Sequence, residues 1–402
     1  MSRQVTSKDL RQRNRAVVLR RFVVAGEASR ADIAAATGLS AATVTNVVAD
    51  LAREGLLREA AVVPSDGGRP IVRFALDGDG AHMIGADVGE QGVTVELFDL
   101  SLRRVARVFR DLPSPSVSPD EIGKALLDAI TGLREAHPER FASLIGVGLG
   151  LPGIVETGAD GVTTLYAQSL GWQPIGIDDG FCHVDVPLHA DNGAKTLATA
   201  EHWFGAARGT AHAIVALIGR GLGAAVIANG SFVRGSSSSA GEWGHTKVSL
   251  GGPKCACGAR GCLEAYVGGG GILRRWRESG ALVRRDDESH LAELLAAADR
   301  GDARAGRVVD ETIEMLGLGL ANLVNLFNPD RIVVGGWAGQ QLLRARGDGL
   351  DGALRQFSLD RPAEQVSLVP CELGDDAVAL GAALLPLNRL IEGDIPAPKA
   401  NS

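Results

Sequence analysis

The chain has 402 residues, 45% of them hydrophobic, which is enough for two or three sizeable cores. It has no run of about twenty apolar residues, and its polar start lacks a signal-peptide core, so we expect a cytoplasmic protein with no membrane partner. The net charge of −7 is uneven: residues 1–75 carry 12 Lys/Arg and 7 Asp/Glu (+5), leaving 29 against 41 (−12) elsewhere. A basic N-terminal region on an acidic body indicates that only this region meets an anionic polymer.

The basic region begins with the pattern of three helices. Apolar residues recur at helical spacing over residues 8–26. A capping-box pattern at Ser29 starts a second helix, which Gly38 ends, and Ser40 caps a third. The third helix buries one face and leaves small or polar side chains exposed at its N-terminal end, as in a helix-turn-helix. We expect the DNA-binding positions of this helix to be Ser40, Ala42, Thr43, Thr45 and Asn46.

A hairpin follows the third helix. Two strand-like runs over residues 58–76 are joined by SDGGRP, in which two glycines permit positive φ. Arg69 at the tip of this wing is placed to enter a minor groove. A plain helical bundle is the alternative for the helices alone, but the wing and the basic charge favour DNA binding. We therefore expect a winged helix-turn-helix domain over residues 1–78.

The rest of the chain has the pattern of two related α/β lobes. The strands IGADVG (84–89) and IVALIGRG (214–221) each end in a glycine turn and precede another strand. We expect a first lobe over 79–195 and a second over 196–392, with a ligand cleft between them and a disordered tail over 393–402. The string GLGLPG at 148–153 follows a strand, but its proline disturbs the turn, so the sequence does not favour a dinucleotide site there.

Three of the five cysteines lie in the short segment CACGARGC. Their spacing is C-x-C-x4-C, and two glycines let the loop fold tightly enough to direct three sulfurs at one point. A histidine ten residues upstream, in GEWGHTKV, completes a closed tetrahedral set, which favours a structural Zn²⁺ over a hydrolytic one. Three free thiols are the alternative. The expected metal ligands are His245, Cys255, Cys257 and Cys262.

These motifs together resemble the ROK family (repressors, open reading frames and sugar kinases) over essentially the whole chain. The blocks DNGAKTLATAEHWFGAARG, GRGLGA, GEWGHTKV and CACGARGCLEAY occur in family order. The resemblance implies an actin-like ATPase (ribonuclease H-like) fold of two α/β lobes, a zinc site beside a sugar cleft, and a homodimer or homotetramer. It also implies that sugar hydroxyls are held by four residues: Asn192, Glu242, His245 and Glu264. At Ser169 the family often has asparagine instead.

The family contains both kinases and regulators, and this chain departs from the kinase pattern at three places. Aligned without gaps on E-H-W-F-G, the position of the kinase base is Gly193. The first phosphate turn reads Asp87-Val88-Gly89-Glu90-Gln91-Gly92, with a carboxylate where a γ-phosphate should lie, and Arg220 replaces a hydroxyl residue in the second turn. We therefore expect no catalytic residues and no enzymatic activity.

The sequence thus predicts a sugar-responsive transcriptional regulator, a repressor, that uses a degenerate kinase cleft as its sensor. Its partners are expected to be a pseudo-palindromic double-stranded operator and a sugar or sugar-derivative effector. Two alternatives remain open at this point. An active sugar kinase with an accessory DNA-binding head would need Asp191 as its base, and a regulator could instead respond to a partner protein.

Overall fold

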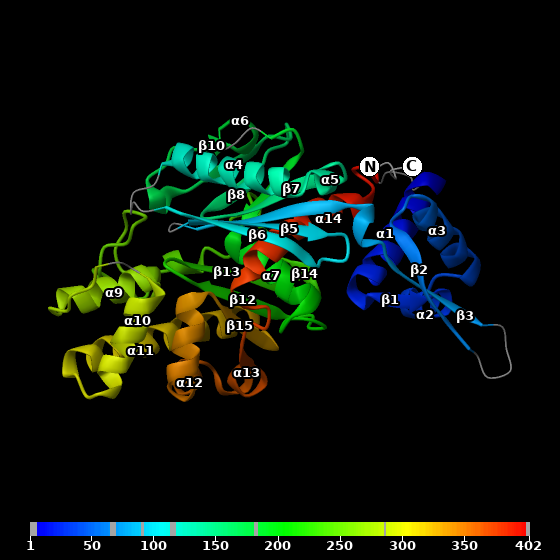
Figure 1. Cartoon of the computed structure of the whole chain (residues 1–402). Helices are drawn as coiled ribbons and strands as arrows, with labels where there is room; N and C mark the ends of the chain where they lie inside the picture. The colour runs from blue at the N-terminus through cyan, green and yellow to red at the C-terminus, as the bar shows by residue number, and fades with distance from the viewer. Residues whose placement is uncertain are drawn as a thin grey trace.

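The computed structural model describes residues 6–64, 70–89, 92–112, 118–180, 184–284 and 287–398. A helical, winged head lies at one end of two α/β lobes, and its wing extends away from them (Figure 1). Within the described ranges, no helix is both long and apolar enough to cross a membrane.

The head has the predicted helix-turn-helix and wing. Its helices are α1 (Ser7–Ala25), α2 (Arg30–Thr37) and α3 (Ala41–Arg53), and its antiparallel sheet has the order β1 (Glu27–Ser29), β3 (Ile71–Leu76), β2 (Leu57–Val63). Ser29 forms the expected capping box with Asp32, and Ser40 accepts from the Thr43 amide at 3.1 Å. The three-residue strand β1 was not predicted, because so short a strand has no readable alternation. Arg69 and the other tip residues, 65–69, lie outside the described residues.

The two lobes contain five-stranded sheets of identical topology. The first has the order β11 (Leu188–Asn192), β7 (Leu144–Leu151), β4 (His82–Val88), β5 (Gly92–Asp99), β6 (Arg104–Asp111). The second has the order β16 (Ser367–Pro370), β15 (Arg331–Gly335), β12 (Ala213–Ile218), β13 (Leu222–Ala228), β14 (Ser231–Phe232). In each, three antiparallel strands are followed by two that run parallel to the first. The predicted duplication is therefore confirmed.

The remaining elements connect and cover these sheets. A small antiparallel sheet in the first lobe contains β8 (Ile154–Thr157), β9 (Thr163–Tyr166) and β10 (Ile175–Gly176). The connecting helices are α4 (Pro119–Ala136), α5 (Pro138–Phe141), α6 (Ile177–Gly180), α8 (Glu264–Val267), α9 (Gly269–Glu278), α10 (Glu288–Asp299), α11 (Ala303–Phe327), α12 (Trp337–Phe357) and α13 (Asp360–Gln365). The 3₁₀ turns are η1 (Gly78–Gly80), η2 (Gln168–Leu170), η3 (Trp243–His245) and η4 (Gly374–Asp376). Helix α4 ends at Ala136, because Pro138 disfavours the helical conformation of the residue before it.

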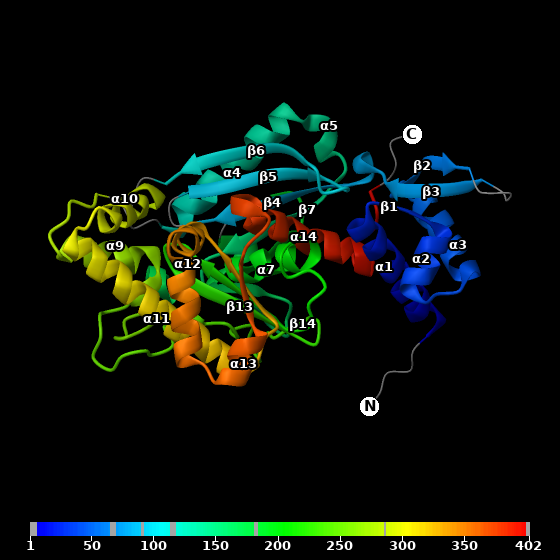
Figure 2. The ribbon, with the colours of Figure 1, turned by 90° about the horizontal axis from the view of Figure 1, so that it is seen from below.

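Two helices cross between the lobes. Both α7 (Gly193–Phe204) and α14 (Ala377–Glu392) follow the fifth strand of their own sheet, but α14 packs on β4 and β7 of the other lobe, and α7 contacts β12 and β13. They also pack against each other so closely that a Cβ at Gly381 would lie 1.8 Å from the carbonyl oxygen of Thr196. Figure 2 shows α14 running from the centre of the molecule toward α1 of the head.

The head and the first lobe share one apolar cluster. Residues of α1, including Leu19 and Phe22, pack with Leu384, Leu387 and Leu390 of α14, and all are buried. Arg15 strengthens this junction, since its guanidinium donates to the carbonyl of Leu390 at 2.9 Å and pairs with Glu54 at 2.7 Å. Of the tail expected over 393–402, Ile395 and Ala397 pack against the same cluster, while 399–402 lie outside the described residues. The head is thus packed onto the body by a continuous apolar core.

Candidate metal centre and ligand cleft

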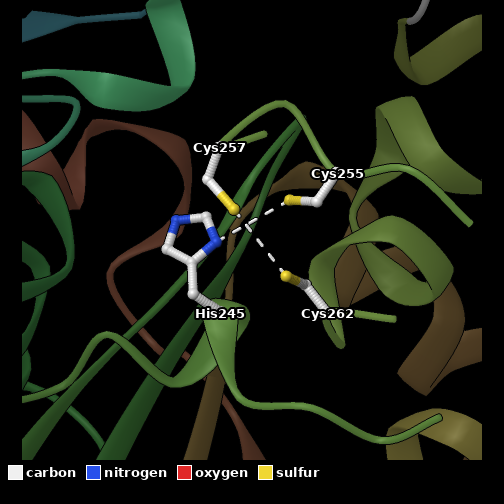
Figure 3. A group of neighbouring side chains, drawn as sticks. All are labelled: His245, Cys255, Cys257 and Cys262. Carbon is white, nitrogen blue, oxygen red and sulfur yellow. Dashed lines mark hydrogen bonds between the residues drawn. The ribbon is translucent and has the colours of Figure 1, made fainter. Parts of the chain in front are cut away.

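Four side chains of the second lobe converge on one point, as the sequence predicted (Figure 3). His245 comes from η3, and Cys255, Cys257 and Cys262 come from the loop before α8; their ligand atoms all lie within 4.8 Å of one another. The Sγ atoms of Cys257 and Cys262 are 3.7 Å apart, as are Cys255 Sγ and His245 Nδ1. A tetrahedral Zn²⁺ with sulfur at about 2.3 Å and nitrogen at about 2.0 Å separates its ligands by about 3.5–3.8 Å. The four residues can therefore hold a metal ion.

Glycine lets the cysteine loop close around this point. Gly258 and Gly261 have φ of 91° and 71°, and a Cβ at Gly261 would lie 1.7 Å from the carbonyl oxygen of Ser249. One contact from the first lobe also reaches the loop: Gln168 Nε2 donates to the carbonyl of Cys257 at 3.0 Å. The metal loop is therefore closed by its own glycines and is also contacted by the first lobe.

Lys247 supports the cluster and was missed by the sequence analysis. Its Nζ lies 3.0 Å from Cys262 Sγ and donates to the carbonyl of His245 at 2.8 Å. The hydrogen bond to Cys262 raises the pKa of Lys247, so a positive charge is held beside a sulfur that must be anionic to bind metal. The available signal was its position two residues after the histidine.

Glu242 and Nε2 of His245 lie next to each other beside the cluster. Since Nδ1 of His245 faces Cys255, Nε2 is directed at Glu242, 4.0 Å from its Oε2. Burial raises the pKa of Glu242, while the charges of His245 and Lys195 oppose the shift. The buried indole of Trp243 donates to the carbonyl of Gly319 at 3.1 Å and anchors this turn. A carboxylate and a ring N–H so placed can bind neighbouring hydroxyl groups.

Glu264 links the metal loop to the second glycine turn. Its Oε2 accepts from the amide of Leu222 at 3.0 Å, and its Oε1 lies 3.4 Å from Cys255 Sγ. Both oxygens of this predicted sugar ligand therefore already have a protein partner, although each carboxylate oxygen can accept a second hydrogen bond.

Asn192, another predicted sugar ligand, lies at the junction of β11 and α7. It caps α7, because its Oδ1 accepts from the amide of Ala194 at 2.9 Å, and its Nδ2 donates to the carbonyl of Gly153 at 2.7 Å. The next residue, Gly193, has room for a side chain: the nearest heavy atom to an added Cβ would be Leu217 Cδ2 at 3.7 Å. Position 193, at which the sequence predicts a kinase base, could thus hold a side chain, but this chain has a glycine there.

Asp191 is buried and paired. Its two oxygens accept from Arg234 Nη1 at 2.8 Å and from the amide of Asn192 at 2.9 Å, and 4% of the residue is exposed. Lys195, one turn along α7, is also buried and donates to the hydroxyl and carbonyl of Ser238. Burial lowers the pKa of Lys195, and the charge of Asp191 partly offsets this. Arg234 and Lys195 were not predicted from the sequence, because they come from separate segments of the chain.

The second glycine turn is closed by the protein itself. The carbonyls of Gly219 and Arg220 accept from the amides of Gly269 (2.8 Å) and Gly270 (3.1 Å), which are the first donors of α9. Helix N-terminal amides are the groups that bind a phosphate, and here two of them are already satisfied. The indole of Trp337 fills the adjacent space, since a Cβ at Gly269 would lie 2.3 Å from Trp337 Cη2.

The first glycine turn begins at a carboxyl group of unusual affinity for protons. Burial and the negative charge of Asp376 raise the pKa of Asp87 to about 7. The residues after Gly89 in this turn, Glu90 and Gln91, lie outside the described residues.

The predicted DNA-facing residues lie at the exposed start of α3. Ala42, Thr45 and Asn46 are exposed, whereas Thr43 is half-buried with its hydroxyl 2.8 Å from that of Ser40. The opposite face of the helix is buried in the head core, as the sequence indicated; its residues are Val44, Val47, Val48 and Leu51.

Comparisons with known proteins agree with this architecture. Residues 83–389 match the ROK family. The chain is 30% identical to the "DNA-binding transcriptional dual regulator NagC" of Escherichia coli K12, over 97% of this chain and 96% of that protein. It is 32% identical to a glucokinase of Halalkalibacterium halodurans, over 75% of this chain and 94% of the kinase. A solved ROK family transcriptional regulator, described as a homolog of the E. coli MLC protein, has the same fold, with a TM-score of 0.74, 22% identity and coverage of 96% and 98%. The chain belongs to the ROK family.

Proposed function

We propose that the protein is a sugar-responsive transcriptional repressor, in which the head binds operator DNA and the cleft binds the effector. The observation that carries this proposal is a winged head packed through one apolar cluster onto the two lobes. On the metal side of the proposed cleft, four ligands converge, and on its phosphate side, the second glycine turn is bonded to the first amides of α9. NagC, named as a DNA-binding regulator, is similar over 97% of the chain, and the glucokinase over 75%.

The effector site comprises Asn192, Glu242, His245 and Glu264. The carboxylate of Glu242 and Nε2 of His245 face one space beside the metal loop, which supports binding of adjacent hydroxyls. Asn192 keeps one amide hydrogen beyond its bond to Gly153, and Glu264 keeps acceptor capacity, so both can add a sugar contact to their structural ones.

The metal is a structural Zn²⁺. Three thiolates and one imidazole are the donors that zinc prefers, and a closed set of four protein ligands leaves no position for a reacting water. Its role is to orient the ring of His245 and to hold the loop that carries Glu264.

The cleft has no phosphoryl-transfer activity. Position 193 has no carboxylate, and both oxygens of Asp191, the base that the kinase alternative needs, are held by Arg234 and a backbone amide. The amides of α9 that could cradle phosphates are bonded to the glycine turn beside Trp337. These contacts favour the regulator over the kinase.

The head engages DNA through α3 and the wing, as a homodimer on a pseudo-palindromic operator. Exposed Ala42, Thr45 and Asn46 at the start of α3 suit base edges and phosphates in a major groove. Arg69 supplies a minor-groove contact from the wing.

A footprinting experiment tests the function. The intact protein should protect a palindromic site upstream of its own gene, and one member of a panel of hexoses, pentoses and N-acetyl sugars should relieve that protection. Two variants separate the sites: Asn46→Ala should weaken protection but keep sugar binding, and Glu242→Gln should do the reverse. ATP-dependent phosphorylation of a sugar at an ordinary enzymatic rate would overturn the proposal.

A further inference from the structure

Helix α7 has one end at Asn192, a predicted sugar ligand, and the other at the head. Its N-terminus is capped by Asn192, and its last turn carries Trp203. The guanidinium of Arg20, on α1 of the head, lies over the Trp203 ring with 5.0 Å between Cζ and the ring centroid. Twelve helical residues span about 18 Å, so a single rigid element connects the two sites.

Arg20 contacts both of the crossing helices. Besides stacking on Trp203, its Nη2 donates to the side-chain oxygen of Asn388 on α14 at 3.2 Å. Since α7 and α14 are in backbone contact at Thr196 and Gly381, they cannot shift far relative to each other without a clash. The head therefore meets the end of a two-helix unit, and Arg20 contacts both of its members.

The two ends of α7 are fixed to different lobes. At the cleft end, Asn192 donates to the carbonyl of Gly153 in the first lobe. At the head end, the buried carboxylate of Glu201 accepts from the amides of Glu372 (3.1 Å) and Leu373 (2.9 Å), which follow the last strand of the second lobe. A change in the angle between the lobes must therefore change the direction of α7.

We propose that α7 couples effector binding to the head, and that the contact between Arg20 and Trp203 is where the coupling reaches α1. This inference rests on the proposed function for the identity of the effector. A ligand that draws the lobes together re-aims α7 and, through Arg20, turns the head against the DNA. The size of the effect is limited by the difference in the ligand's affinity for the two arrangements.

A double-mutant cycle tests the coupling without knowledge of the sugar. Asn192→Ala removes the α7 cap at the cleft end and should change operator affinity at least threefold in the otherwise wild-type protein. In an Arg20→Lys background, which keeps the charge but loses the planar stack, the same change should have less than a 1.5-fold effect. Two controls are matched: Ser118→Ala removes the capping box of α4, and Arg11→Lys alters an exposed arginine of α1. Neither control substitution should change how Asn192→Ala and Arg20→Lys depend on each other in their effects on operator affinity.

Repeating the affinity measurements with the sugar panel distinguishes a failure of this inference from a failure of the proposed function. If a sugar from the panel shifts wild-type operator affinity, Arg20→Lys should reduce that shift at least threefold while the sugar still binds. An unreduced shift, or an Asn192→Ala effect equal in both backgrounds, overturns the role of α7 and leaves the regulator intact. If no sugar shifts the wild-type affinity, the proposed function fails, and the cycle alone still decides whether α7 couples the two ends.

Discussion

The two sides of the proposed cleft, one at the metal cluster and the other at the second glycine turn, differ in the groups that they present. On the metal side, side chains from η3 and the cysteine loop converge, and Glu242 lies beside them with its Oε2 4.0 Å from Nε2 of His245. On the side of the second glycine turn, the carbonyls of Gly219 and Arg220 accept from the first two amides of α9, and Trp337 packs beside them. This contrast is what we expect of a fold that keeps one ligand site and loses another.

The comparison also explains why the missing base is the smaller part of the difference. Position 193 has room for an aspartate, so one substitution would restore the carboxylate. The second glycine turn is held instead by main-chain bonds to α9 and by the packing of Trp337. A substitution at position 193 does not change either of these.

Breaking the metal side should have the largest effect. We expect Cys257→Ser to lower the zinc content from one ion per chain to near zero and to lower Tm by about 10 °C, because the loop loses the ligand bonds that hold it. Sugar binding should be lost before operator binding, since the head core does not include the loop. Cys371→Ser, at a buried cysteine that is not part of the cluster, is the control. Normal zinc content and a normal sugar response in Cys257→Ser would contradict the assignment.

Opening the phosphate side should come next. Trp337→Ala should lower the unfolding free energy by about 2–3 kcal/mol, because its indole packs against the turn and against the second-lobe core. Titration with a fluorescent ATP analogue should show no binding to the wild-type protein below millimolar concentration and measurable binding to the variant. Micromolar binding by the wild type would show that the turn opens in solution and that the two sides differ less than we infer.

Asp87, at the start of the first glycine turn, should make the stability of the protein depend on pH. Asp87 has a pKa of about 7 in the folded protein against about 4 when unfolded, so its neutral form favours folding. This contribution is complete below about pH 4 and is lost as the pH rises through 7, at up to about 1.4 kcal/mol per pH unit. Denaturant titrations should show a shallower fall between pH 4 and 7 in Asp87→Asn than in the wild type. Asp128→Asn, on the exposed face of α4, should keep the wild-type slope, and equal slopes in all three would refute the shift.

Restoring the base should have the smallest effect. Gly193→Asp places an acid in the first turn of α7, where the helix dipole favours it, so we expect stabilisation of up to about 1 kcal/mol. A coupled assay with ATP and the sugar panel should still detect no sugar phosphate. Phosphorylation by this single variant would mean that the loss of the base, and not the closed turn, separates this chain from a kinase.

The features that could be predicted from the sequence are those that depend on residues close together in the chain. The capping box at Ser29, the two lobes that each begin with a strand, a short turn and a second strand, and the C-x-C-x4-C loop with its upstream histidine depend on short spacings. The described residues have the capping box, the repeated strand order and the cysteine–histidine cluster. The crossing of α7 and α14 between the lobes could not be read, because it depends on contacts such as that of Gly381 with Thr196, far apart in the chain. For the same reason the sequence did not show that Arg234 pairs with Asp191.

The central claim is that this cleft senses a sugar and does not phosphorylate it. The most direct test measures operator affinity by fluorescence anisotropy across the sugar panel, with and without ATP and Mg²⁺, while assaying the same samples for sugar phosphate. We expect one sugar to change operator affinity at least fivefold to the same extent in both conditions, with no phosphorylated product. A response that requires ATP, or that is accompanied by stoichiometric sugar phosphate, would contradict the account.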